Sequence, residues 1–167
     1  MAKSFAAAGT KIYIGGAPLA SSGVDLTIGD FPSAGEGAIT WTEIGGVTNV
    51  GSVGDSAEVI TSSPLGQQRI RKMKGVRNAG TMELVADLDY ADPGQLALIA
   101  AEKTQYSYPF KVTFNDAPAG GTPSERYFVA IVFSATEAIE EASNTIRLLS
   151  TLEVDSNMVR VAAAEDD

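Results

Sequence analysis

Residues 57–103 read AEVITSSPLGQQRIRKMKGVRNAGTMELVADLDYADPGQLALIAAEK, and they indicate the fold more clearly than any other segment of the chain. The first residues of this segment favour a strand, and a basic stretch follows. Apolar and polar residues then alternate, which is typical of a half-buried strand, and the last part carries the start signal of a short helix. This order predicts a mainly β fold in which one helix follows a strand.

The basic stretch, residues 62–78, is predicted to be a long loop, because Pro64 and Gly66 lie near its start. The chain has a formal net charge of -9, yet five of its twelve Lys and Arg residues lie here: Arg69, Arg71, Lys72, Lys74 and Arg77. A cationic loop on an acidic body is suited to docking onto another copy of the chain. Opposite charges raise the encounter rate and orient the surfaces that meet.

Two other interpretations of the five cations stay open. They could contact the phosphates of a nucleic acid, or the loop could simply be solvated and flexible. A nucleic acid is disfavoured because no aromatic residues are interleaved with the cations, and proteins that bind single strands use aromatic rings as stacking platforms. Docking onto another copy is therefore the favoured interpretation.

The alternating part, residues 80–89, predicts a strand with two different faces. Its apolar face comprises Met82, Leu84, Ala86 and Leu88, and its polar face includes Glu83, Asp87 and Asp89. Residues 145–154 alternate in the same way, and their polar face includes Arg147, Thr151 and Glu153. Both segments are expected to bury one face and to expose the other.

A helix is predicted to start after Asp92. This side chain can cap the helix by accepting a hydrogen bond from a free backbone N–H, and Pro93 fits the first helical position, where its missing N–H costs nothing. Gln95 lies three residues after the cap and can reach back to it. The predicted apolar stripe, which continues to about Lys103, comprises Leu96, Ile99 and Ala100.

The remaining predicted strands are residues 11–14, 39–50, 57–61, 106–114 and 126–136. Gly45-Gly46 is expected to bend the second strand, which should pair with the third. The last of these strands is so apolar that both faces should be covered. Residues 15–37 predict a long loop, and residues 156–167 predict a frayed tail. About seven strands and one flanking helix predict a β-sandwich or a partly open barrel, in one domain spanning residues 1–167.

The chain contains no cysteine and no histidine. This excludes disulfides and thiolate metal sites, and it removes the nucleophile systems that depend on histidine. We therefore expect no enzyme activity, no cofactor and no metal ion. No apolar run reaches the roughly 20 residues that cross a bilayer, and the N-terminal segment is too weakly apolar for a secretory signal. A cytosolic product without membrane contact is expected.

The order of these elements resembles the major tail tube proteins of long-tailed, lambda-type bacteriophages, which have relatives in contractile-tail tubes and the type VI secretion tube. The resemblance covers residues 39–154. It rests on a strand with Trp41 and a glycine pair, the long loop, an alternating strand, the Asp-Pro-Gly-Gln-Leu helix start and three long final strands. The resemblance rests on the order of these elements and not on any single motif. It implies a non-enzymatic subunit with a β-sandwich and a flanking helix.

The resemblance also implies six copies in a ring, and rings stacked into a hollow virion tube that is made in the host cytoplasm. Double-stranded DNA would pass through the tube without specific binding. The long loop would become ordered on assembly and touch the next ring. The implied partners are further copies of the chain and other tail proteins, namely an initiator, a tape measure and a terminator. The alternative function is a soluble β-sandwich module that binds a sugar or a protein.

A bore that passes DNA should be acidic or neutral, because Lys and Arg would hold the phosphates. The candidates for lining this lumen are Glu83, Asp87, Arg147, Thr151 and Glu153. The alternative is an ordinary solvent-exposed strand face, which commonly carries polar and acidic residues.

Overall fold

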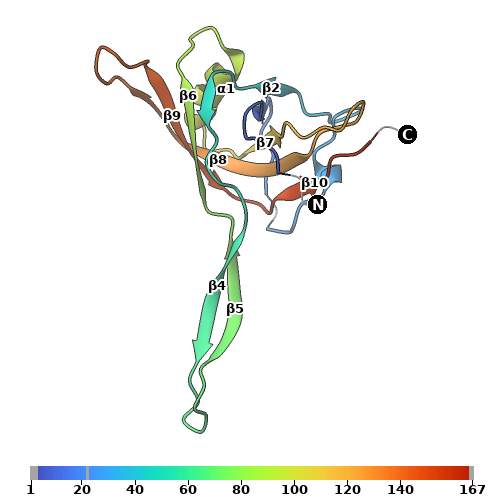
Figure 1. Ribbon diagram of the computed structural model, residues 1–167, viewed down its shortest axis with the longest axis vertical. Helices are drawn as coiled ribbons and strands as arrows, with labels where there is room; N and C mark the ends of the chain where they lie inside the picture. The colour runs from blue at the N-terminus through green and yellow to red at the C-terminus, as the bar shows by residue number, and fades with distance from the viewer. Residues whose placement is uncertain (1–3, 22, 166–167) are drawn as a thin grey trace.

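The computed structural model describes residues 4–21 and 23–165 of the 167-residue chain. These residues form two parts, which Figure 1 shows: a curled eight-stranded sheet with one helix, and a two-stranded hairpin that extends away from it. The elements are β1 (Lys11–Gly15), η1 (Ile28–Asp30), β2 (Trp41–Glu43), β3 (Val47–Asn49), β4 (Ser56–Ser62), β5 (Arg71–Asn78), β6 (Thr81–Asp87), α1 (Pro93–Glu102), β7 (Tyr108–Thr113), β8 (Glu125–Ala138), β9 (Arg147–Val154) and β10 (Val159–Val161).

The large sheet is antiparallel and runs in the order β2-β1-β7-β8-β9-β6-β3, with β10 added to β8. Its two end strands are consecutive in the chain, because only residues 44–46 separate β2 from β3. The sheet must therefore curl until its ends come close together. The ladder of hydrogen bonds does not close, so the mainly β prediction, with a partly open barrel and one flanking helix, is confirmed.

The predicted strand 39–50 is divided at Gly45-Gly46 into two strands that lie at opposite ends of the sheet. Gly46 has φ +69°, and a Cβ there would lie 2.8 Å from the carbonyl oxygen of Asp87. Only glycine suits both conditions. The expected bend is thus a complete break, and the expected pairing with residues 57–61 is wrong, since β2 pairs with β1 and β3 pairs with β6.

The helix begins where the sequence predicts. The side chain of Asp92 accepts a hydrogen bond from the backbone N–H of Gln95 at 2.8 Å, and Pro93 is the first helical residue. Gln95 does not reach back to the cap. Its buried amide donates instead to the carbonyls of Gly45 and Asp87 and accepts from the N–H of Asp89.

This inward position of Gln95 fixes which side of α1 faces the sheet. The buried residues are Gly94, Gln95, Leu98 and Ala101, so the predicted stripe is wrong for Leu96 and Ala100, which are exposed. Gly94 allows the close approach, because a Cβ there would lie 2.1 Å from the carbonyl oxygen of Glu43. The helix packs tightly against the β2–β3 link as a result.

The main core lies inside the curl of the sheet. Met82, Leu84 and Ala86 of β6 are buried there with Leu148 and Leu152 of β9, as their alternation predicts. Phe110 and Phe128 stack beside them, with ring centroids 5.6 Å apart. The opposite faces of β6 and β9 carry no part of this core.

A second, smaller core covers the other face of β8. It contains Phe31, Tyr127 and Val129, and the segment between β1 and β2 packs over it. Apart from η1, the described residues of that segment form no regular element, which agrees with the predicted loop. Asn157 holds it in place, because its amide accepts from the N–H of Leu26 at 2.6 Å and donates to the carbonyl of Leu26 at 3.0 Å. β8 is therefore covered on both faces over residues 127–130, but the prediction of two covered faces is wrong farther along the strand, where Phe133 is 64% exposed.

The C-terminal segment is not frayed over the residues described. β10 pairs with residues 125–127 of β8, and Ala164 bridges Thr122. The prediction of a frayed tail is wrong up to this bridge, because the main chain finds an open edge to pair with. Asp166 and Asp167, which end the predicted tail, lie outside the described residues.

The predicted basic loop, residues 62–78, is mostly a strand. β5 pairs with β4 along its whole length, and only residues 63–70 connect the two. The loop prediction failed because β5 exposes both faces to solvent. A strand with no buried face shows no apolar alternation for the sequence to reveal.

Candidate assembly surfaces

The hairpin is exposed along its whole length. In β4 and β5 only Ala57 and Gly75 are partly covered. Neither strand pairs with any other element in the part of the chain that the structure describes. Large apolar side chains are also exposed along it: Val59, Ile60, Leu65, Ile70, Met73 and Val76. A two-stranded hairpin is only marginally stable alone in water, and exposed apolar patches mark interaction sites.

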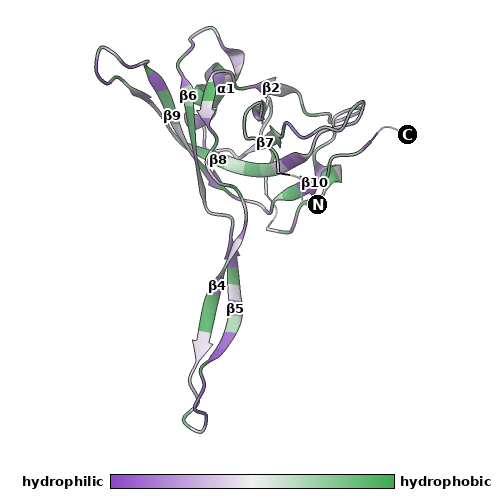
Figure 2. Ribbon diagram, viewed as in Figure 1, coloured by the Kyte–Doolittle hydropathy of each residue, from purple (hydrophilic) through white to green (hydrophobic). Residues whose placement is uncertain are grey.

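The strand register places cations on both faces of the hairpin. Lys72 and Lys74 lie opposite Thr61 and Val59 on one face, whereas Arg71 lies opposite Ser62 on the other. Figure 2 shows that hydrophobic and hydrophilic residues are mixed along these strands. The hairpin therefore resembles an interface element, which combines apolar contact area with charge, more than a part of the core.

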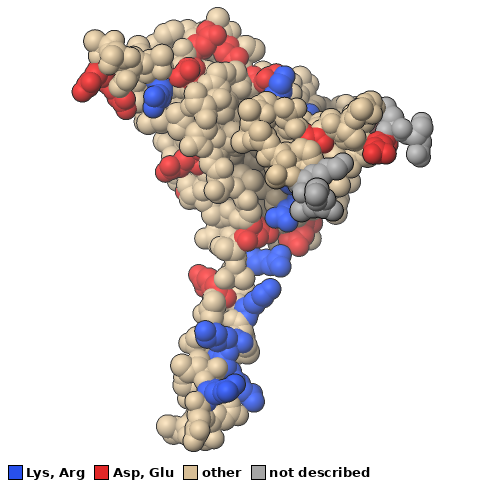
Figure 3. All heavy atoms as spheres, viewed as in Figure 1, with Lys and Arg blue, Asp and Glu red and all other residues tan. Residues whose placement is uncertain are grey.

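All five predicted docking cations lie on this hairpin. Arg69 is in the connection and the other four are on β5. Figure 3 shows that Lys and Arg gather along the hairpin, whereas Asp and Glu predominate at the opposite end of the molecule. The structure thus brings together the residues that the sequence singled out. Their role in docking remains a prediction.

The five lumen candidates also lie together, on the face of β6 and β9 that points away from the main core. Glu83 is opposite Thr151, and Asp87 is opposite Arg147. Glu153 accepts a hydrogen bond from the hydroxyl of Thr81 at 2.8 Å. This face is polar apart from Val85 and Leu149, which are opposite each other. That this face lines a lumen stays a prediction.

Two sheet edges next to this face are open. β8 pairs with β7 only as far as Ala130, so the described chain provides no partner on that side for residues 131–138. At the other edge, β3 is the end strand of the sheet, and no described strand pairs with its outer side. Open edges present unpaired backbone groups, which can add a strand from another molecule. Sequence reasoning missed both edges, because they depend on where neighbouring strands end.

Trp41 belongs to a cluster on the second core. The ammonium of Lys111 lies 4.6 Å from the ring centroid of Tyr13 and 5.3 Å from that of Trp41. Lys111 is also 3.9 Å from the carboxylate of Glu125, which accepts a hydrogen bond from the hydroxyl of Tyr127. Burial, and then this hydrogen bond, raise the pKa of Tyr127. Among the described residues no buried side-chain nitrogen or oxygen lacks a hydrogen-bond partner, so we interpret the cluster as part of the packing of the second core.

Neither a protein-family model nor a curated protein sequence matches the chain. Solved structures do share its fold. A chain of the six-fold symmetrised baseplate of the anti-feeding prophage has a TM-score of 0.65 at 12% identity, over 97% of this chain and 98% of its own. The sheath/tube terminator of the extracellular contractile injection system PVC gives a TM-score of 0.65 at 12% identity, over 96% and 99%. The SPP1 tail tube gives 0.57 at 11% identity, over 94% and 78%.

These similarities show that the chain has the tail tube fold, which confirms the resemblance drawn from the order of its elements. The similar structures are components of tubes, terminators and baseplates, not enzymes. No helix in residues 4–21 and 23–165 is long and apolar enough to cross a membrane.

Proposed function

We propose that this chain is the subunit of a phage tail tube, in which hexameric rings stack into a hollow tube for double-stranded DNA. The observation that carries the proposal is the hairpin of β4 and β5. Its faces and edges are exposed, it carries both apolar and cationic side chains, and it has no partner within the described chain. Such an element is stabilised when another molecule covers it.

Ring formation is supported by the two open edges. When one copy contributes the β8 edge and the next contributes the outer edge of β3, the contact is head-to-tail, and a suitable rotation closes it into a ring. The sheets of successive copies then form one continuous wall. The six-fold symmetry applied to the anti-feeding prophage baseplate supports six copies in this ring.

Stacking of rings is assigned to the hairpin. Its cations, Arg69, Arg71, Lys72, Lys74 and Arg77, contact acidic groups of the next ring, and its apolar side chains bury surface in the same contact. The first interaction orients the copies and the second supplies most of the affinity. Because a different head-to-tail contact repeats along the axis, stacking continues without end until a terminator stops it.

The face of β6 and β9 lines the bore in this proposal. Glu83, Asp87 and Glu153 repel phosphates, whereas Arg147 is opposite Asp87 and adds little attraction of its own. DNA then passes without being held. The fold occurs both in a phage tail tube and in contractile injection systems, so the fold alone does not identify the cargo. The proposal that the cargo is DNA rests on the acidic residues of the β6 and β9 face. The expected partners are an initiator, a tape measure and a terminator, and the expected location is the virion, after synthesis in the host cytoplasm.

Electron microscopy of the concentrated, negatively stained protein tests the proposal. Six-membered rings or hollow filaments of uniform width are expected. A strict monomer at all concentrations, also after seeding with sonicated filaments or with an initiator, would instead favour a soluble binding module. Light scattering gives a second readout, because charge-driven stacking should weaken as the ionic strength rises.

A further inference from the structure

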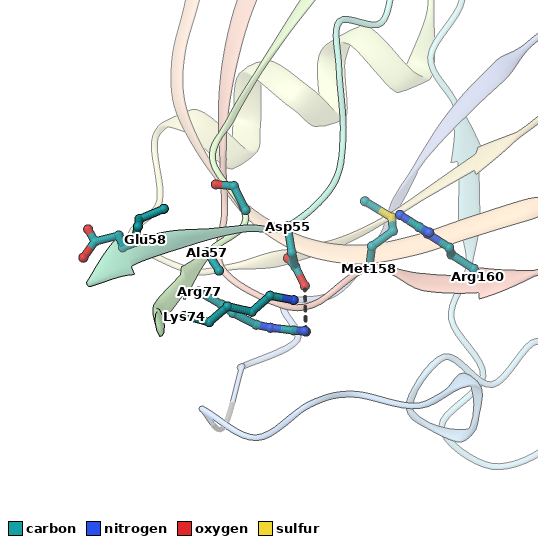
Figure 4. Close-up of a pocket in the computed structure, with 9 residues that line it drawn as sticks. Asp55, Ala57, Glu58, Lys74, Arg77, Met158 and Arg160 are labelled. Carbon is teal, nitrogen blue, oxygen red and sulfur yellow. Dashed lines mark ion pairs between the residues drawn. The ribbon is translucent and has the colours of Figure 1, made fainter. Parts of the chain in front are cut away.

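A cationic cleft lies where the hairpin leaves the body. Its volume is about 610 Å³, and its walls come from β4, β5 and the segment leading through β10. Figure 4 shows Lys74 and Arg77 extending into the gap from the hairpin side, with Met158 and Arg160 facing them from the body. Arg160 reaches the base of the hairpin, because its Nη2 lies 4.0 Å from the position of a Cβ on Gly54.

Cations outnumber carboxylates in the lining of this cleft. Asp55 lies 3.9 Å from Arg77 and is the one acidic group drawn toward the gap in Figure 4, since the carboxylate of Glu58 points away. Within the described residues, Lys74 and Arg160 form no ion pair. Three cations and two carboxylates, those of Asp55 and Glu58, therefore line the cleft, which also has an apolar part formed by Met158 and Val59.

The turn between β8 and β9, residues 139–146, has the complementary chemistry. Glu140 and Glu141 are exposed at its tip beside Ile139, whose side chain is 74% exposed. The backbone N–H of Asn144 donates to the carbonyl of Glu141 at 2.9 Å, and its side chain donates to Glu140 at 3.0 Å, so the turn has a defined shape. It presents an apolar side chain flanked by carboxylates, whereas the cleft presents apolar side chains flanked by cations.

The two surfaces cannot meet within one molecule. Figure 1 shows the β8–β9 turn at one end of the long axis and the hairpin leaving toward the other. The cleft lies where the hairpin leaves the body, so the two surfaces are on opposite sides of the body. Two surfaces that match in chemistry and face opposite ways form a head-to-tail contact, which repeats from copy to copy.

We infer that the cleft at the base of the hairpin is a carboxylate-binding site, and that its occupant is the β8–β9 turn of a second copy of this chain in the adjacent ring. Glu140 and Glu141 pair with Lys74 and Arg160, and Ile139 packs against Met158. This inference rests on the proposed tube function and specifies its stacking contact. It assigns the base of the hairpin, not only its tip, to the contact between rings.

Disulfide trapping tests the contact directly, because the chain has no cysteine of its own. The double variant Ile139→Cys/Met158→Cys should form a ladder of covalently linked chains on oxidation, since each copy supplies one cysteine to each neighbour. The matched variant Ile139→Cys/Leu65→Cys, with the second cysteine at the exposed hairpin tip, should give little ladder. The two single variants should give dimers at most. A ladder from the tip variant but not from the cleft variant would overturn the inference.

Charge reversal provides an independent readout. Lys74→Glu/Arg160→Glu and Glu140→Lys/Glu141→Lys should each raise the critical concentration for filaments at least about tenfold, because like charges that meet at an interface repel strongly. A chain that carries all four changes, or an equimolar mixture of the two double variants, should recover assembly. Circular dichroism checks that each variant is folded.

The outcomes of these experiments distinguish a failure of the cleft contact from a failure of the proposed tube function. Filaments of the wild-type chain together with unaltered assembly of both reversed variants would overturn the cleft contact and leave the tube function standing. A wild-type chain that forms no filaments, together with an Ile139→Cys/Met158→Cys variant that forms no ladder, would overturn both. If Lys74→Glu/Arg160→Glu loses retention of short duplex DNA while assembly is unchanged, the cleft binds phosphate and the inference is wrong.

Discussion

The side-chain amide of Gln95 donates a hydrogen bond of 2.8 Å to the backbone carbonyl of Asp87, and this bond ties the buried face of α1 to the end of the strand that carries two lumen candidates. The same amide donates to Gly45, in the link between the two end strands of the sheet. One buried side chain therefore joins the helix to β6 and to the link between the two end strands of the sheet.

Replacement of Gln95 by leucine should be strongly destabilising. Gln95→Leu leaves the carbonyls of Gly45 and Asp87 and the N–H of Asp89 without their partner, and unsatisfied buried groups cost about 1–3 kcal/mol each. We expect the free energy of unfolding, measured in urea, to fall by about 3 kcal/mol. Gln105→Leu is the matched control, because Gln105 is exposed, and it should change stability by less than about 0.5 kcal/mol. Equal effects would contradict this role.

Tyr127 should make stability depend on pH in the alkaline range. Burial and the hydrogen bond to Glu125 raise the pKa of Tyr127, so the folded state keeps its proton where the unfolded state loses it, above about pH 10. The stabilisation is complete below that pH and decreases above it, by about 1.4 kcal/mol per pH unit.

The variant Tyr127→Phe isolates this contribution. Urea unfolding between pH 9 and about pH 11 should show a smaller loss of stability with pH than the wild-type chain shows. Tyr106→Phe is the control, because Tyr106 is 63% exposed, and it should keep the wild-type slope. If the free energy of unfolding changes with pH equally in the wild type and in Tyr127→Phe, then Tyr127 has the same pKa in the folded and the unfolded state, and the prediction is wrong.

Lys111 should contribute more to stability than an exposed lysine that forms a similar ion pair. Lys111→Met removes the cation above Tyr13 and Trp41 and leaves Glu125 without its ion pair, and we expect a loss of about 1–2 kcal/mol. Lys11→Met removes the exposed pair with Glu43 and should cost about 0.5 kcal/mol or less. Fluorescence gives a second readout, since Trp41 is the one tryptophan of the chain and only the first variant should shift its emission.

The sequence predicts best where an element buries one face. The alternation of β6 and β9 follows from burial on one side, and the start of α1 follows from Asp92 and Pro93, which act locally. Both were predictable because the signal lies in neighbouring residues. The orientation of α1 could not be predicted in this way, since it depends on hydrogen bonds from Gln95 to β6 and to the β2–β3 link.

The residues of the candidate site were predictable from the sequence, but the secondary structure that carries them was not. The five cations are evident from charge alone, yet β5 is a strand without a buried face, so periodicity could not identify it. The cleft at its base could not be predicted either, because Arg160 lies more than 80 residues after Lys74 and reaches it through the pairing of β10 with β8. Long-range pairing of this kind leaves no local pattern.

The proposed bore gives the last prediction, which concerns DNA passage and not stability. Glu83→Lys/Glu153→Lys places cations on the exposed face of β6 and β9, where the proposal puts the lumen. Tubes of this variant should retain linear duplex DNA, and retention should fall steeply with rising salt because phosphate binding releases counterions. Wild-type tubes should retain none. The control Glu36→Lys/Glu165→Lys makes the same change in net charge at exposed positions on other segments, and its tubes should behave like the wild type. If the control tubes retain DNA equally well, net charge and not position explains the result, and this face does not line the bore.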